Sequence, residues 1–235
     1  MSLIAALEVR IPADHAELGG DLVIPSKALG LVIFAHGSGS SRKSPRNQYV
    51  ARRLQEAGFG TLLMDLLTIS EERLDMERGH LRFDIPFLAG RLRAATEWAK
   101  RQEGLSKLSV AYFGASTGAA AALVAAGQAP GIVRAVVSRG GRPDLAGSVL
   151  NVVEAPTLLI VGGNDLQVLD LNRKAFEVLR CEKQLSVVPG ASHLFEETGA
   201  LERVATLAAG WFRGHLDSIE WAPSQRELSA PLRGE

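Results

Sequence analysis

A serine within a run of small residues is the position in this sequence whose surroundings point most directly to chemistry. Residues 114–118 read Gly-Ala-Ser-Thr-Gly, with Ser116 at the centre. A short apolar run, Leu108–Phe113, precedes the motif, and an alanine-rich stretch, Ala119–Ala126, follows it. A G-x-S-x-G motif between a strand and a helix is typical of a tight turn that presents the serine hydroxyl as a nucleophile. We therefore predict that Ser116 is a nucleophile; the alternative is a plain turn in which Ser116 caps the helix.

A serine nucleophile needs a neighbouring base, and that base needs a group to orient it. Two later side chains follow predicted strands and suit these roles. Asp165 comes after the apolar run Leu158–Val161, and His193 comes after two valines and a Pro-Gly turn. The carboxyl ends of parallel strands meet at one edge of a sheet, so we expect both side chains to lie near Ser116. The sequence predicts a triad in which His193 takes the serine proton and Asp165 orients the imidazole.

Each of these partners also has a simpler interpretation. Asp165 directly precedes Leu166, where a helix-capping residue is expected, and His193 taken alone is an ordinary loop histidine. Glu196 and Glu197 follow His193 and are alternative carboxylates for orienting it. The joint occurrence of all three side chains after separate predicted strands favours the triad.

Backbone donors for a developing oxyanion are expected beside the serine. The N–H of Thr117 is the first candidate, because it follows the nucleophile directly. Residues 36–40, His-Gly-Ser-Gly-Ser, follow another apolar run, and we choose the N–H of Ser38 as the second donor with Gly37 as the fallback. His36 is a rival candidate for the base, but a role in holding this loop by hydrogen bonding suits it better.

Two arginines in the segment after the strand Ile132–Ser138 are candidates for substrate binding. Arg139 and Arg142 could hold a carboxylate or phosphate group of the substrate. The alternative is a structural turn in which a salt bridge joins this segment to Asp144. Arg42 and Arg46, after the His-Gly-Ser-Gly-Ser loop, are weaker candidates for the same role.

The hydrophobic pattern predicts alternating strands and helices. Strands are expected at Leu3–Ile11, Leu18–Ile24, Leu31–Ala35, Phe59–Leu67, Leu108–Phe113, Ile132–Ser138, Thr157–Val161 and Leu185–Val188. Helices are expected at Pro45–Ala57, Asp84–Arg101, Ser116–Gln128, Leu169–Arg180 and Gly199–Leu216, and Thr68–His80 is expected to be a polar loop.

This order predicts an α/β fold. An initial antiparallel pair leads into a mostly parallel, doubly wound sheet of about eight strands with helices on both faces. We expect a single domain over residues 1–217. Residues 218–235, which are rich in charge and contain Pro223 and Pro231, are expected to be an irregular tail.

Composition argues against several classes of protein. Lys plus Arg and Asp plus Glu balance at 26 each, so no basic field favours nucleic acid. The one cysteine, Cys181, excludes an intrachain disulfide and fits a reducing compartment. The first residues lack the basic start of a signal peptide, and no run of about 18 apolar residues predicts a membrane span. We expect a cytoplasmic protein with no metal, no cofactor and a small-molecule acyl substrate; homo-oligomer formation is left open.

Four motifs together carry a family resemblance. His-Gly-Ser-Gly-Ser (36–40), Gly-Ala-Ser-Thr-Gly (114–118), Gly-Gly-Asn-Asp-Leu-Gln-Val (162–168) and Gly-Ala-Ser-His-Leu-Phe (190–195) resemble the α/β-hydrolase superfamily. They are most similar to small dienelactone-hydrolase-like members, some of which occur fused to phosphoribosyltransferase domains. The resemblance spans about residues 20–215.

The resemblance carries one departure and one implication for access to the site. Authentic dienelactone hydrolases use a cysteine where this chain has Ser116, which favours general serine-esterase chemistry over dienelactone cleavage. Many relatives insert a cap after the strand that follows the helix next to the serine motif. The stretch from Ser138 to Ala155 is too short for a helical cap domain, so we expect an open site that suits small or exposed acyl groups.

The function predicted from these observations is a serine hydrolase. It would cleave a small carboxylic ester, thioester or lactone through an acyl-enzyme intermediate. A serine peptidase or an acyltransferase on the same triad is the alternative among enzymes. A non-catalytic binding module with the same fold is the alternative from another class.

Overall fold

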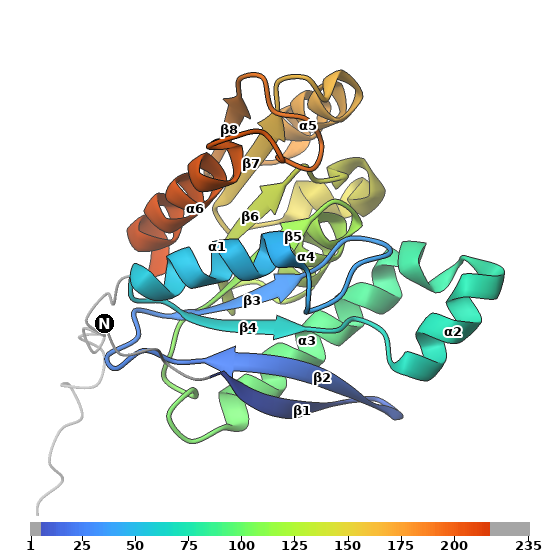
Figure 1. Ribbon diagram of the computed structural model, residues 1–235, viewed down its shortest axis with the longest axis vertical. Helices are drawn as coiled ribbons and strands as arrows, with labels where there is room; N and C mark the ends of the chain where they lie inside the picture. The colour runs from blue at the N-terminus through green and yellow to red at the C-terminus, as the bar shows by residue number, and fades with distance from the viewer. Residues whose placement is uncertain (1–5, 217–235) are drawn as a thin grey trace, which may run out of the picture.

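The computed structural model describes residues 6–216, and its strands and helices alternate as the hydrophobic pattern predicts (Figure 1). The strands are β1 (Leu7–Ala13), β2 (Ala16–Val23), β3 (Leu31–Ala35), β4 (Gly60–Met64), β5 (Val110–Ala115), β6 (Val133–Arg139), β7 (Thr157–Gly162) and β8 (Lys183–Val188). The helices are α1 (Pro45–Glu56), α2 (Ile69–Arg78), α3 (Ile85–Arg101), α4 (Thr117–Gln128), α5 (Leu166–Val178) and α6 (Ala200–Leu216). Two 3₁₀ segments, η1 (Leu81–Phe83) and η2 (Pro143–Val152), complete the described elements.

All the described strands join one eight-stranded sheet in the order β1-β2-β4-β3-β5-β6-β7-β8. The pairs β1–β2 and β2–β4 are antiparallel, and the remaining pairs are parallel. Figure 1 shows α1 and α6 on one face, with α3 and α4 behind the sheet. The predicted α/β architecture is therefore confirmed, with its antiparallel pair at one edge and its parallel strands in the centre.

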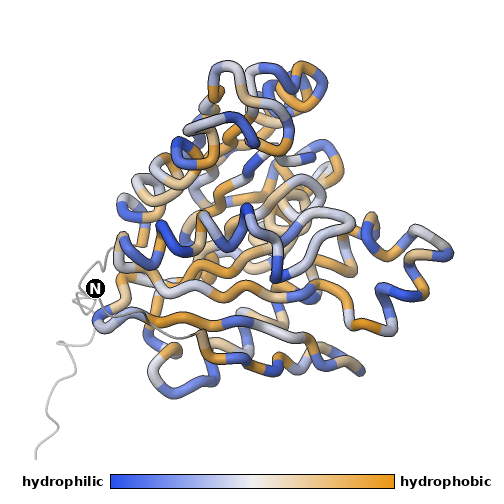
Figure 2. Tube along the Cα trace, viewed as in Figure 1, coloured by the Kyte–Doolittle hydropathy of each residue, from blue (hydrophilic) through white to orange (hydrophobic). Residues whose placement is uncertain are grey.

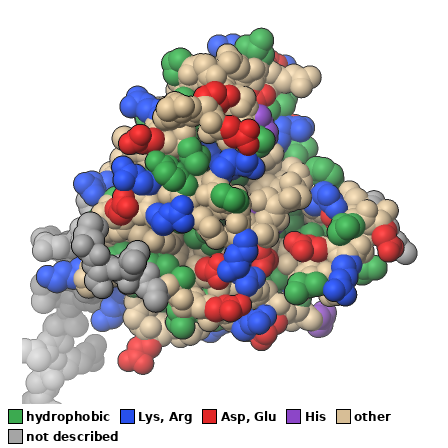
Figure 3. Space-filling view, in the orientation of Figure 1, with side chains coloured by type: hydrophobic (Ala, Val, Ile, Leu, Met, Phe, Trp, Pro, Cys, Tyr) green, Lys and Arg blue, Asp and Glu red, His purple; other side chains and the backbone are tan. Residues whose placement is uncertain are grey.

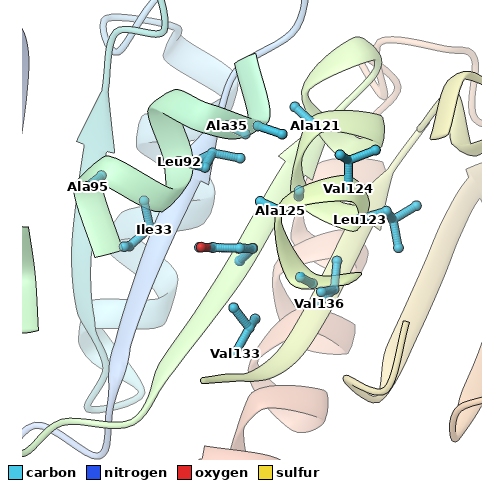
Figure 4. Packing of buried hydrophobic residues seen from close by; sticks show 14 of the residues in the cluster. Ile33, Ala35, Leu92, Ala95, Ala121, Leu123, Val124, Ala125, Val133 and Val136 are labelled. Carbon is cyan, nitrogen blue, oxygen red and sulfur yellow. The ribbon is translucent and has the colours of Figure 1, made fainter. Parts of the chain in front are cut away.

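Apolar side chains on both faces of the central strands form the core. Strands β3, β4, β5 and β7 are buried along their whole length, and Figure 2 shows hydrophobic colour along the central strands. On one face, Ile33, Leu92, Ala121 and Val136 belong to the cluster shown in Figure 4, to which β3, α3, α4 and β6 contribute. A second large cluster fills the other face, beneath α1 and α6. A sheet buried on both faces makes a rigid platform for side chains at its carboxyl edge.

Helix α2 corrects one prediction, because Thr68–His80 was expected to be a loop. The Thr68 hydroxyl accepts from the N–H of Glu71, and the Glu71 carboxylate accepts from the N–H of Thr68, which is a capping box. Gly79 ends the helix in the left-handed conformation. The apolar side chains of α2, such as Ile69 and Met76, are largely exposed, so the segment lacks the buried stripe on which the prediction of helices depended.

The connection between β6 and β7 contains only the 3₁₀ segment η2, so the expectation of no cap domain at this point holds. The first strand was predicted to start at Leu3, and within the described residues it begins at Leu7. The predicted tail at 218–235 lies outside the described residues. Within residues 6–216, no helix is both long and apolar enough to cross a bilayer.

Candidate active site

Ser116 lies at the turn between β5 and α4, as its motif predicts. Its backbone has φ 51° and ψ −122°, a region that non-glycine residues rarely adopt. A Cβ at Gly114 or Gly118 would collide with backbone atoms of the 118–119 turn or of residues 35 and 36, respectively. The small residues of the motif therefore let α4 start directly against β5 and β3. The Ser116 side chain caps no helix N–H, so the capping alternative is not what the structure shows.

Asp165 and His193 are in contact at the carboxyl edge of the sheet. The Asp165 Oδ2 and His193 Nδ1 atoms lie 2.6 Å apart. Asp165 occupies the N-cap position of α5, yet its side chain makes no capping hydrogen bond and is directed to the imidazole instead. The two alternative carboxylates are used elsewhere: Glu196 pairs with Arg46, and Glu197 accepts from the N–H of Ser192. The contact leaves the Nε2 edge of the ring available for chemistry.

A glycine at the end of β7 permits this contact. A Cβ at Gly162 would lie 2.5 Å from the carbonyl oxygen of Ser192 and closer still to that of Ala191. Phe195, buried to 1% exposure with φ 55°, anchors the same loop beyond His193. The loop that carries His193 therefore packs directly on the strand that delivers Asp165.

Ser116 and His193 each lie beside the end of β6. The Ser116 N–H donates to the carbonyl oxygen of Arg139 at 3.2 Å. At the next residue, a Cβ on Gly140 would lie 3.2 Å from the carbonyl oxygen of His193 and 3.5 Å from its Nδ1. Within the described chain the Ser116 hydroxyl makes no hydrogen bond with His193; such bonds often tighten only when substrate binds.

The two predicted oxyanion donors are neighbours. The Ser38 N–H donates to the Thr117 hydroxyl at 2.8 Å, so this N–H is satisfied within the protein. It can serve an oxyanion only if the Thr117 hydroxyl turns away. The Thr117 N–H lies in the first turn of α4, where backbone N–H groups have no intrahelical acceptor. Gly37, the fallback donor, packs against Ser116: a Cβ on it would lie 3.1 Å from that of Ser116.

His36 holds the loop and is not free to act as a base. Its Nε2 accepts from the N–H of Leu66 at 3.0 Å, so its Nδ1 carries the proton and donates to the carbonyl oxygen of Gly37 at 2.9 Å. Burial lowers the pKa of His36, which keeps the ring neutral. The Nε2 bond therefore ties the 36–40 loop to the segment after β4, and the Nδ1 bond lies within the loop itself.

A cavity of about 430 Å³ opens beside this loop. Thr117 and residues 36–41 line one side, and side chains of α2 and η1, among them Glu72, Met76 and Arg82, line the other. This size suits a small-molecule site. The α2 residues were not predicted to line a site, because their segment was expected to be a loop; the T-x-x-E capping box was the signal that could have revealed the helix.

The two predicted substrate-binding arginines have different surroundings. Arg142 forms a two-point ion pair with Asp144, at 2.9 and 2.8 Å, which is the contact expected under the structural alternative. Arg139 is buried at the end of β6 and makes no hydrogen bond through its guanidinium within residues 6–216. On the face of the molecule shown in Figure 3, basic and acidic side chains are interspersed, consistent with the balanced composition.

Comparison with known proteins gives a consistent set of relatives. The sequence model of the dienelactone hydrolase family matches residues 18–213. Two Mycobacterium tuberculosis proteins, provisionally named phosphoribosyl transferases, are each 58% identical over 209 residues, which is 89% of this chain and 46% of theirs. The chain therefore spans about half the length of these curated relatives.

Solved structures extend the similarity to the fold. A dienelactone hydrolase from Anabaena variabilis superimposes with a TM-score of 0.89 and is 56% identical; the match covers 91% of this chain and 99% of that one. Est1E from Butyrivibrio proteoclasticus superimposes with a TM-score of 0.73 over 88% of this chain and 98% of its own. At 16% identity, Est1E shows the fold alone.

Proposed function

Because the chain belongs to the dienelactone hydrolase family, we propose that it is a serine hydrolase that cleaves a small carboxylic ester, thioester or lactone. One observation carries the proposal: the Asp165–His193 contact lies at the same sheet edge as a serine held in a strained turn. An orienting carboxylate after β7, an imidazole after β8 and a serine hydroxyl after β5 are the parts that acyl transfer requires.

In the proposed mechanism, the Ser116 oxygen attacks the substrate carbonyl carbon while His193 Nε2 takes the hydroxyl proton. The carbonyl oxygen becomes an oxyanion, which the Thr117 N–H and a second N–H from the 36–40 loop stabilise. Collapse of this intermediate expels the alcohol or thiol, which receives the proton from His193. Water then gives a proton to His193 and attacks the acyl group, and the second collapse releases the acid and restores the serine.

The size of the cavity supports a small substrate. The volume of about 430 Å³ beside the oxyanion donors is close to the lower end of typical small-molecule sites. The provisional transferase name of the M. tuberculosis relatives refers to proteins of about twice the matched length, whereas the dienelactone hydrolase model matches residues 18–213 of this chain.

A fluorophosphonate probe tests the proposal directly. The probe phosphonylates an activated serine with loss of fluoride, so we expect one covalent adduct per chain, located by peptide mass spectrometry on Ser116. The matching activity measurement is turnover of short-chain 4-nitrophenyl esters and thioesters. No adduct together with no turnover would favour the non-catalytic binding module. An adduct with turnover only of amides, or only with an added acyl acceptor, would favour the peptidase or the acyltransferase.

The close packing of the His193 loop on Gly162 leads to a further testable prediction. Gly162→Ala should push the His193 loop away from β7, lowering ester turnover by roughly 10²-fold and the free energy of unfolding by roughly 1–3 kcal/mol. Kinetics and urea denaturation measure the two effects. Gly210→Ala is the matched control, because a Cβ at this helical position meets no neighbouring atom within 4 Å. Equal behaviour of the two variants would show that the packing of the loop on β7 does not position His193.

A further inference from the structure

Arg139 carries a buried charge that pairs with no carboxylate in the part of the chain that the structure describes. The residue retains only 8% exposure, and its Nε and Nη1 atoms are fully buried without a hydrogen-bond partner among the described residues. Burial, and next the proximity of Arg46, lower the pKa of Arg139 to about 10, so the side chain stays protonated at neutral pH. A buried guanidinium without an anion is costly, which makes this arrangement unusual for a purely structural residue.

The surroundings of Arg139 are also positive. Arg46 lies in the first turn of α1, and its Nε is likewise buried without a partner in the described chain. No acidic residue lies in that first turn, where the helix dipole adds positive potential. The Arg46 Nη1 pairs with the Glu196 carboxylate at 3.1 Å, but Glu196 is 64% exposed. Of the two guanidiniums, only that of Arg46 therefore has a carboxylate partner among the described residues, and that carboxylate is solvated.

We propose that Arg46 and Arg139 form a binding site for a phosphate group. The unpaired nitrogens belong to two side chains and are buried, so both side chains must turn toward solvent to bind the ligand. A tetrahedral group with several oxygens can then accept from both at once. A phosphate monoester carries about −1.5 to −2 charges at neutral pH, which matches two guanidiniums if Glu196 is released to solvent. The start of α1 adds favourable potential for the same ligand.

The site borders the candidate active site, which gives the phosphate a place in the reaction. The carbonyl oxygen of Arg139 accepts from the Ser116 N–H, and Glu196 belongs to the loop that carries His193. A phosphate borne by the substrate would therefore be held close to the reacting carbonyl. This second step rests on the proposed function, whereas phosphate binding itself does not depend on hydrolysis.

Binding of inorganic phosphate to the full chain is the first test, with acetate at matched ionic strength as the comparison. At a hundredfold excess over Kd, phosphate should raise Tm by roughly 5–10 °C. Arg139→Met should abolish this shift without lowering Tm in phosphate-free buffer, because it removes an uncompensated buried charge. Arg46→Gln should weaken binding by about tenfold or more, measured by calorimetry. If Arg139→Met does not fold, the phosphate binding of Arg46→Gln tests the proposal instead.

Arg53→Gln is the matched control, because it removes the same charge from an exposed position of α1 that pairs with Glu56. It should bind phosphate like the wild type. The proposal is overturned if phosphate binds no better than acetate, or if Arg46→Gln and Arg53→Gln bind it equally. A loss of Tm in Arg139→Met with the phosphate shift retained would also overturn it.

Paired esters identify the source of the phosphate. The 4-nitrophenyl esters of an acyl chain that ends in phosphate or in methyl differ only at that end. The site is assigned to the substrate if kcat/KM is at least about tenfold higher for the phosphate ester than for the methyl ester. Arg46→Gln should remove this difference, and added inorganic phosphate should compete with the phosphate ester. If kcat/KM is equal for the two esters and inorganic phosphate still binds, the site is assigned to free phosphate. Phosphate binding without hydrolysis of any ester would refute the proposed function and leave the site standing.

Discussion

Ser116→Ala is expected to lower kcat for short-chain esters by on the order of 10⁴-fold or more, because the members of a triad act as a unit. Without the hydroxyl no acyl-enzyme forms, and only the oxyanion donors and substrate binding remain. The substrate Kd should change little, since Ser116 contributes to the transition state and not to the cavity walls. Steady-state kinetics and fluorophosphonate labelling measure the loss.

The matched control for this variant is Ser148→Ala, which removes a hydroxyl from an exposed position in η2. It should keep the turnover and the labelling of the wild type. The alanine at 116 should also relieve little strain, because alanine meets the same backbone penalty at positive φ. Turnover or labelling near the wild-type level in Ser116→Ala would show that another side chain is the nucleophile.

Asp165→Asn is expected to lower kcat by roughly 10⁴-fold while leaving the fold intact. The amide has nearly the same shape as the carboxylate, but it carries no charge to stabilise the imidazolium. Its NH₂ group can also bind Nδ1 in the tautomer that leaves the proton on Nε2, where the base must be free. Kinetics at saturating ester, together with circular dichroism to verify folding, measure the effect.

Two further variants show whether the effect belongs to Asp165. Asp170→Asn changes a carboxylate on the exposed face of α5, where it pairs with Lys174, and serves as the control for the loss of one charge. Glu197→Gln tests the alternative orienting residue, which lies on the His193 loop and accepts from the Ser192 N–H. If Glu197→Gln loses as much activity as Asp165→Asn, the carboxylate assignment is wrong.

The residues of the candidate site were found from the sequence because each follows a predicted strand. In an open α/β sheet, the position of a residue after a strand already places it at the carboxyl edge. Ser116, Asp165 and His193 come after β5, β7 and β8, and the structure brings Asp165 and His193 into contact there. The strands themselves were predictable because strands buried on both faces appear as continuous apolar runs.

Helix α2 and the hydrogen bonds of the loops could not be predicted from the hydrophobic pattern. The apolar side chains of α2 face outward, and Glu72 and Met76 line the cavity, so no buried periodic stripe marks the helix. The Ser38 N–H was predicted to face the substrate, whereas the structure directs it to the Thr117 hydroxyl. That bond joins residues far apart in sequence, and sequence patterns report neighbours along the chain only.

By itself, the sequence determined the α/β architecture, and it predicted the tight turn at Ser116 and the three side chains proposed to perform acyl transfer. These follow from local patterns: apolar runs, small residues at a tight turn, and polar residues at strand ends. Only the tertiary structure decided which carboxylate meets His193, that Arg142 pairs with Asp144, and that Arg139 is buried without a partner among residues 6–216. The reason is physical: the charge balance of a side chain depends on the groups that folding places around it, and these come from distant parts of the chain.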